Sequence, residues 1–355
     1  MRCARLRFPF SGIRFRSSVL CLLFSALGFA GCRGRETPVE AGVRTQTLHL
    51  ALGAEPRDLD PHILVAYNDM LVALALFEGL TAIDEKTSQP VPAVAERWES
   101  SPDGLTWTFH LRTGLKWSDG TPLTAEDFVA SWQRALSPKL GSEYAYVLFA
   151  LKNAEAFNAG RIADPASVGA RAPDERTIEV TLERPTPFLA ALTALPAWFP
   201  VPRHTIVKLG ALDDRANPWT RRDPVVSNGP FVLKEWRPNQ RIVTERNAQH
   251  YAAATTRLQS VVFYPMENAV AQEAAFRAGQ LHLTYELPIS KIAAYREREP
   301  EKLRTDPFLE TAFLRFNTTK PPFNDARVRA AFARALDRRA LVEHVTLGGQ
   351  RPARA

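Results

Sequence analysis

The sequence predicts a mixed α/β protein with two or more domains, and three observations carry that prediction. With 355 residues, the chain is long enough to bury more than one hydrophobic core. Residues 105–111 and 177–183 alternate apolar with polar side chains, which is typical of half-buried strands. Residues 269–279 follow a helical pattern that ends on Gly279, a common helix stop signal.

Residues 95–128 predict a compact unit of a turn, a strand and a helix. Ser-Pro-Asp-Gly at 101–104 favours a tight turn, because proline presets φ and glycine accepts positive φ. Thr124, with Asp127 three residues later, forms a capping-box-like helix start. The other strands are expected at residues 47–52, 81–85, 231–236, 241–247, 260–265 and from 279, and the other helices at 69–80 and 186–194. Residues 310–317 also alternate.

The charge distribution argues against a nucleic-acid partner. The formal charge of +7 arises in the first 35 residues, which hold seven of the 45 basic residues and no acidic one. The remaining chain therefore carries 38 basic and 38 acidic residues, which leaves no basic footprint for nucleic acid. All three cysteines lie near the start, so the body can form no disulfide and no thiolate metal site.

The N-terminus has the pattern of an export signal. A basic stretch precedes the apolar run 19–30, which is too short to span a bilayer comfortably. Phe-Ala-Gly-Cys at 29–32 resembles a bacterial lipobox, although leucine is usual where Phe29 stands. We expect a signal peptide over 1–31, a lipid anchor on Cys32 and a polar tether over 32–45. The alternative is a plain secretory signal that is cleaved nearby.

An ordered series of motifs resembles the family-5 extracytoplasmic solute-binding proteins, the peptide-binding lipoproteins of ABC importers. The resemblance covers roughly residues 46–345. The segments that carry it are Glu55–Pro61, Glu96–Trp98, Thr108–Arg112, Lys116–Gly120, Thr124–Phe128, Phe199–Pro202, Ser227–Phe231, Glu245–Tyr251, Gly279–Leu283 and Asn324–Arg338.

The resemblance implies a fold similar to the type II periplasmic binding proteins, in which two lobes surround a cleft and a β-rich domain is inserted in the first. It implies a first lobe built from residues 46–77 and 203–309, with residues 78–202 as the inserted domain. Residues 310–355 would begin the second lobe, which continues for well over a hundred residues in the family. We therefore expect a C-terminally truncated chain with an incomplete second lobe.

The same resemblance implies which residues line the cleft. By position, Val65, Ala66 and Tyr67 would contact the ligand backbone, and Tyr144 and Tyr285 would line the cleft. For Tyr144, a buried core tyrosine is an equal alternative. Glu286 stands where peptide-binding members usually carry asparagine, so a carboxylate replaces the amide that would contact a peptide there.

The function that the resemblance implies is peptide capture by closure of the lobes, followed by delivery to a membrane permease that works with separate ATPase subunits. The protein would be a periplasmic or envelope-anchored monomer. Another solute, such as nickel, haem or an opine-like compound, and a truncated remnant or sensor lipoprotein remain alternatives. The sequence carries no nucleophile elbow, phosphate loop, dinucleotide fingerprint or metal-ligand spacing, so we expect no enzyme, cofactor or metal site.

Overall fold

The computed structural model describes residues 36–221, 224–306 and 310–353. Its contacts divide the chain into residues 1–37 and residues 38–355, and the elements below belong to the second unit. The expected signal peptide over 1–31 and the expected lipidation at Cys32 lie outside the described residues. Among those residues, no helix is both long and apolar enough to cross a membrane.

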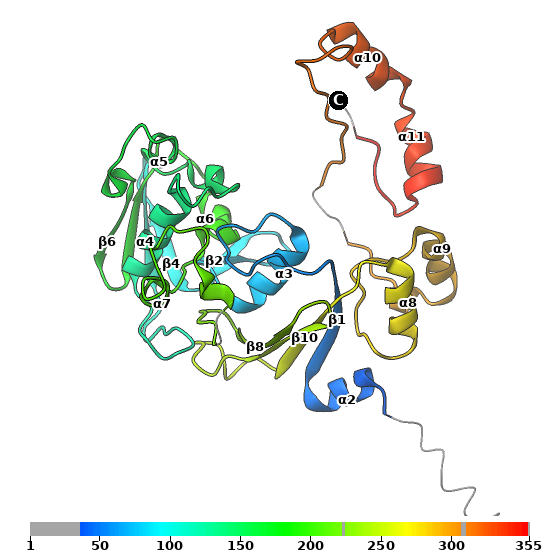
Figure 1. Ribbon diagram of the computed structural model, residues 1–355, viewed down its shortest axis with the longest axis horizontal. Coiled ribbons are helices and arrows are strands. Elements are labelled where there is room, and N and C mark those ends of the chain that lie inside the picture. The colour runs from blue at the N-terminus through cyan, green and yellow to red at the C-terminus, as the bar shows by residue number, and fades with distance from the viewer. Residues whose placement is uncertain (1–35, 222–223, 307–309, 354–355) are drawn as a thin grey trace, which may run out of the picture. The chain divides into compact units, whose positions relative to one another are not determined.

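The first sheet joins the start of this unit to a stretch far along the chain. Its four strands run in the order β1-β10-β9-β8, and β1 lies parallel to β10 while the other neighbours are antiparallel (Figure 1). The predicted hairpin between β8 and β9 is confirmed, and Asn239 in its turn adopts φ 58°. The strands are β1 (Thr47–Gly53), β8 (Phe231–Arg237), β9 (Arg241–Arg246) and β10 (Ser260–Pro265).

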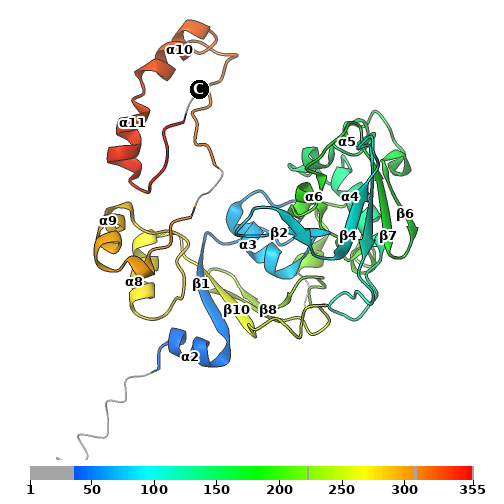
Figure 2. The same ribbon diagram turned by 180° about the vertical axis from the view of Figure 1, so that it is seen from behind.

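The second sheet confirms the strand and helix predicted between residues 105 and 136. Along β5, Trp107, Phe109 and Leu111 are buried and alternate with half-buried polar residues, as the pattern predicted. Helix α4 packs against this sheet, and its capping box of Thr124 and Asp127 is present (Figure 2). The strand order is β4-β5-β7-β6, made of β4 (Ala95–Ser100), β5 (Thr106–Leu111), β6 (Ala170–Asp174) and β7 (Thr177–Thr181), with α4 at Ala125–Leu136.

The remaining elements are short. Strands β2 (Thr81–Ile83) and β3 (Pro90–Pro92) form a separate antiparallel pair. The other helices are α2 (Pro38–Thr45), α3 (Tyr67–Leu76), α5 (Ala154–Asn158), α6 (Leu189–Leu192), α7 (Arg203–Ile206), α8 (Ala269–Arg277), α9 (Ile289–Arg298), α10 (Ala326–Ala335) and α11 (Arg338–Leu341).

Two expected element boundaries are wrong. Helix α3 ends at Leu76 rather than near residue 80, because the chain turns extended at Phe77 and the Leu76 carbonyl accepts the Gly229 N–H at 2.7 Å. A Cβ on Gly229 would lie 2.5 Å from the Leu76 carbonyl carbon, so only glycine allows this approach. The strand expected from residue 279 is reduced to a single parallel bridge between Leu283 and Leu50.

The second half of the segment expected as a tether is helical. Residues 38–45 form helix α2, and the Val39 N–H donates to the Gly279 carbonyl at 2.9 Å. Gly42 is buried, and a Cβ there would lie 2.5 Å from the Thr47 carbonyl oxygen and 2.8 Å from His282 Cε1. The polar composition therefore gave no sign of this helix, which packs closely against Thr47 and His282 at Gly42.

We expect Gly42→Ala to destabilise the chain by roughly 1–3 kcal/mol, because the added methyl overpacks a fixed contact. Glycine-to-alanine changes inside unconstrained helices have the opposite sign, stabilising by about 0.5–1 kcal/mol. Urea unfolding measures the difference. Val43→Ala, at an exposed position of the same helix, should change the free energy of unfolding by no more than about 0.5 kcal/mol. A stabilised Gly42→Ala variant would contradict the docking of α2.

Candidate ligand-binding site

Two of the predicted site residues, 218 positions apart in sequence, meet beside the end of β1. The ring centroids of Tyr67 and Tyr285 lie 6.3 Å apart with their planes inclined by 42°. Tyr67 begins α3 and is 50% exposed. The Tyr285 ring lies over Gly53, where a Cβ would come within 3.0 Å of its Cδ1 atom. Gly53 also has φ +75°, so the close approach and the backbone both require glycine.

The backbone that carries Tyr285 and Glu286 is held by one buried side chain. Gln272 of α8 is fully buried, and its Oε1 accepts the N–H groups of Tyr285 at 2.8 Å and Glu286 at 2.9 Å. Its Nε2 donates to the Met266 carbonyl at 2.6 Å. The sequence prediction did not include Gln272. An amide on the buried face of a helix was the signal for it, because buried amides need partners.

The electrostatic surroundings of Tyr285 are acidic. Burial, followed by the charge of Glu286 and the proximity of Tyr67 and Glu310, raises the pKa of its hydroxyl. The Glu286 side chain itself is exposed. The Tyr67–Tyr285 pair therefore has the carboxylate of Glu286 directly beside it.

The other predicted residues are placed as follows. Tyr144 is 39% exposed, so the buried-core alternative is wrong, and its ring pairs with Tyr146 at 5.8 Å. Val65 is exposed and Ala66 precedes the first residue of α3. The structure thus brings the Tyr67 ring beside Tyr285, with Val65 and Ala66 directly before it in the chain, while Tyr144 belongs to a separate aromatic pair in residues 78–202.

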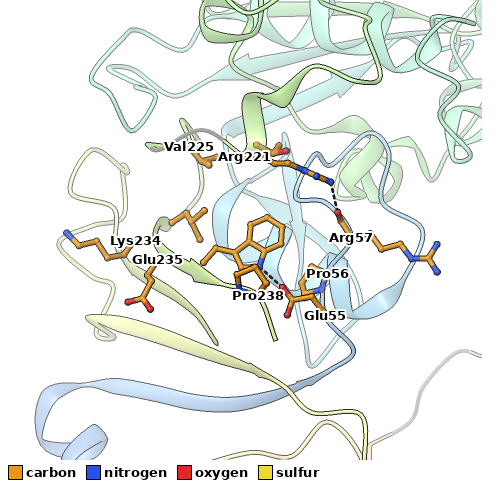
Figure 3. Close-up of a pocket in the computed structure, with 11 residues that line it drawn as sticks. Glu55, Pro56, Arg57, Arg221, Val225, Lys234, Glu235 and Pro238 are labelled. Atoms are coloured by element: carbon orange, nitrogen blue, oxygen red, sulfur yellow. Dashed lines mark hydrogen bonds between the residues drawn. The ribbon is translucent and has the colours of Figure 1, made fainter. Parts of the chain in front are cut away.

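A pocket of about 600 Å³ opens on the face of β8, and its lining contains none of the predicted site residues (Figure 3). Trp236 Nε1 donates to Glu55 Oε1 at 2.6 Å, and the Arg221 guanidinium donates to the Arg57 carbonyl at 3.3 Å. Figure 3 shows the charged end of Lys234 directed away from the middle of the pocket. The lining residues are Glu55, Pro56, Arg57, Thr220, Arg221, Val225, Leu233, Lys234, Glu235, Trp236 and Pro238. Several of its polar side chains are already paired with residues outside the lining: Lys234 with Glu245, Glu235 with Arg241, and Thr220 with Asp58.

The described residues contain no group of three histidine, cysteine, aspartate or glutamate side chains that could hold a metal ion. The exposed Tyr67 ring, the half-buried Tyr285 ring and the Glu286 carboxylate are the chemical groups that this position offers.

A buried ion pair that sequence reasoning missed joins the segment after β1 to α4. Arg134 of α4 donates to Asp60 through both terminal nitrogens, at 3.1 and 2.6 Å, and through Nε to the Leu212 carbonyl at 2.6 Å. Asp60 and Arg134 are both buried, and Trp219 Nε1 also donates to Asp60 at 3.2 Å. The motif around Asp60 was noticed in the sequence, but its partner lies 74 residues away.

His62 completes this cluster as a neutral imidazole. Its Nε2–H donates to the Phe199 carbonyl at 2.9 Å, so its Nδ1 is free to accept from Arg134 at 2.9 Å. Burial and the Arg134 charge lower the pKa of His62 to about 4. Burial alone would raise the pKa of Asp60, but the charge and hydrogen bonds of Arg134 outweigh it and lower that pKa. The cluster joins residues 60 and 62 to residues 134 and 199, and it is structural.

Comparison with known protein families shows which family the chain belongs to. The profile of the bacterial extracellular solute-binding proteins, family 5 middle, matches residues 89–355, which is most of the chain. The chain belongs to the family-5 solute-binding proteins. A probable deoxycholate-binding periplasmic protein of Escherichia coli is 42% identical over 84% of this chain, and a periplasmic oligopeptide-binding protein of Salmonella typhimurium is 39% identical over 97%.

Solved structures of family-5 proteins share the fold. The oligopeptide-binding protein of Burkholderia pseudomallei superposes with a TM-score of 0.80 at 36% identity, covering 86% of this chain and 58% of that one. The Haemophilus influenzae relative, solved with the peptide RPPGFSPFR, gives 0.76 at 32% identity, covering 86% and 59%. The fold is therefore the mixed α/β type II periplasmic-binding fold. The chain spans 55% and 62% of the two curated relatives named above.

Proposed function

We propose that this family-5 protein captures peptides outside the cytoplasm and delivers them to a membrane permease served by separate ATPase subunits. The observation that carries the proposal is the contact between the exposed Tyr67 ring and the half-buried Tyr285 ring, whose backbone N–H is held by the buried Gln272 side chain. Aromatic faces on a rigid support suit extended chains of varied sequence. Relatives with the same fold are named as peptide binders, and one was solved with a peptide in place.

The proposed mechanism is capture by closure. Residues 46–77 and 203–309 supply one lobe, residues 78–202 the inserted domain, and residues from 310 the start of a second lobe. A ligand that binds the closed arrangement more tightly than the open one drives the closure. The proposal includes a monomer that is anchored by lipid on Cys32 and that acts without nucleic acid, cofactor or metal.

Native mass spectrometry of the gently purified protein tests this function. An added mass of a few hundred daltons, released as a mixture of peptides, is the expected result. A folded protein that carries a steroid acid would instead favour the solute named for the Escherichia coli relative. A folded protein that binds neither class would contradict the proposal.

We expect Tyr285→Ala to weaken peptide binding by roughly 10- to 100-fold, because about 1.5–3 kcal/mol of ring contact is lost. Titration calorimetry with the recovered peptides measures this loss. Tyr285→Phe keeps the ring and should stay within about threefold of the parent, because the hydroxyl contributes less than the ring face. Phe188→Ala removes an exposed ring elsewhere and should leave the affinity unchanged. Equal affinities for Tyr285→Ala and the parent would show that the pair does not line the site.

A further inference from the structure

The segment that carries Tyr285 and Glu286 is attached to β1 through a histidine side chain. The His282 N–H donates to the His49 carbonyl at 2.8 Å, as in an ordinary ladder. In the reverse direction, the His49 N–H donates to Nδ1 of the His282 ring at 3.0 Å. Two residues further along β1, the Ala51 N–H donates to the Leu283 carbonyl at 3.1 Å. An imidazole nitrogen therefore stands in for one backbone acceptor at this edge.

That bond exists only while the imidazole is neutral. Nδ1 accepts a hydrogen bond when it carries no proton, whereas a protonated imidazole has an N–H on both nitrogens. Protonation of His282 would place its Nδ1–H against the His49 N–H, and neither could accept. Histidine is also the side chain that changes charge between about pH 5 and pH 8.

A second imidazole makes a positive charge here still less favourable. The rings of His49 and His282 stack with centroids 5.6 Å apart and planes inclined by only 4°. Burial and the neighbouring His282 lower the pKa of His49, whose Nδ1 forms a hydrogen bond of 3.0 Å with the Tyr264 hydroxyl. Two stacked imidazolium ions would repel each other.

The groups around this stack can be named element by element. Helix α2 lays Gly42 against the His282 ring and carries Glu40 and Arg44 in its first and last turns. Strand β10 contributes Tyr264. Burial raises the pKa of its hydroxyl, and the positive charge of Arg241 on β9 partly offsets that rise. On α8, Glu273 is already paired with Arg277 and Tyr295.

We propose that His282 is a positioning residue: its neutral imidazole holds the wall that carries Tyr285 and Glu286 against β1, and its protonation in mild acid loosens that wall and weakens ligand binding. The positioning half stands on the hydrogen bonds of residues 49–51 and 282–283. The ligand half rests on the proposed function. The consequence is a solute site that holds its ligand better at neutral than at acidic pH.

Hydrogen exchange of single backbone amides, followed by NMR on the full chain, tests the positioning half without any ligand. At about pH 7.5 the His49 amide should be protected, and at about pH 5 its protection factor should fall roughly tenfold. His282→Asn offers an amide oxygen as a non-titrating acceptor, so its protection should be the same at both pH values. In His282→Phe, which offers no acceptor, the His49 amide should be unprotected at both pH values. If this variant does not fold, the comparison of the parent with His282→Asn is enough to decide the test.

Two further variants separate His282 from its neighbours. His49→Phe keeps a stacked ring that cannot titrate. In this variant the backbone amide of residue 49 should still lose its protection in acid. His110→Asn alters a histidine that pairs with Glu99 on the second sheet and should behave as the parent. Protection that is independent of pH in the parent, or unchanged pH dependence in His282→Asn, overturns the proposal. Disappearance of the effect in His49→Phe would assign the proton to His49 and overturn it as well.

The effect of His282 on ligand binding is tested with a synthetic pool of random tetrapeptides as the probe. Affinity for the parent should fall about tenfold between about pH 7.5 and about pH 5, whereas affinity for His282→Asn should change much less. Both proteins carry the same carboxylates, so the difference isolates His282. If the exchange result holds but the pool binds at neither pH, the peptide function fails and the positioning role of His282 stands. A fall of the same size in both proteins overturns the ligand half.

Discussion

Replacing Arg134 with methionine should lower the free energy of unfolding by about 3–5 kcal/mol. The substitution fills much of the same volume but leaves the Asp60 carboxylate buried without its cation. A buried charge without a partner loses its hydration and gains no compensating attraction. Urea unfolding at neutral pH, with both sheets followed by tryptophan fluorescence, measures the loss.

A double-mutant cycle separates the ion pair from simple packing. Asp60→Asn combined with Arg134→Met removes both charges, so it should be clearly less destabilised than the sum of the two single variants. Arg97→Ala removes an exposed partner of Glu99 and should change the free energy of unfolding by less than about 1 kcal/mol. If Arg134→Met matches Arg97→Ala, the buried pair contributes little to stability.

Mild acid should destabilise the folded chain by about 3 kcal/mol through His62 alone. The pKa of this imidazole is lowered from 6.5 to about 4 by burial and by the Arg134 charge. Between these two pH values the unfolded chain binds a proton at residue 62 and the folded chain does not. Stability contributed by the neutral imidazole is therefore complete above pH 6.5, and it is lost as the pH falls towards 4.

Unfolding free energies measured across that pH range test the assignment. His62→Gln keeps a donor for the Phe199 carbonyl and an acceptor for Arg134, but it cannot titrate, so it should flatten the pH dependence. His344→Gln replaces an exposed histidine and serves as the control for the substitution itself. A His62→Gln variant with the parent's slope would place the titrating group elsewhere.

Local patterns predicted local structure well. The alternation along Thr106–Leu111 and the capping box at Thr124 and Asp127 depend on neighbours a few residues away, so the sequence contains what decides them. Helix α2 was missed because its position depends on Gly42 fitting against Thr47 and His282, which no local pattern records.

The site could be predicted only in part. Tyr67 and Tyr285 were expected from resemblance, and the structure places their rings together, while their role in binding stays a prediction. Gln272 and Arg134 were not predicted because each bonds to a residue in another element, 13 and 74 positions away. A polar side chain inside an apolar helical face indicates that a partner exists but not which one.

The pairing of β1 has a consequence for the order of assembly during synthesis. Thr47 pairs with Ser260, and His49 bonds to a residue 233 positions later. At about 5–20 residues per second, the ribosome would need roughly ten to fifty seconds to supply these partners. The antiparallel sheet of β4–β7 uses much nearer contacts and can form in that interval. Until β10 emerges, β1 remains an unpaired strand, and the risk of aggregation through this strand is highest during that interval.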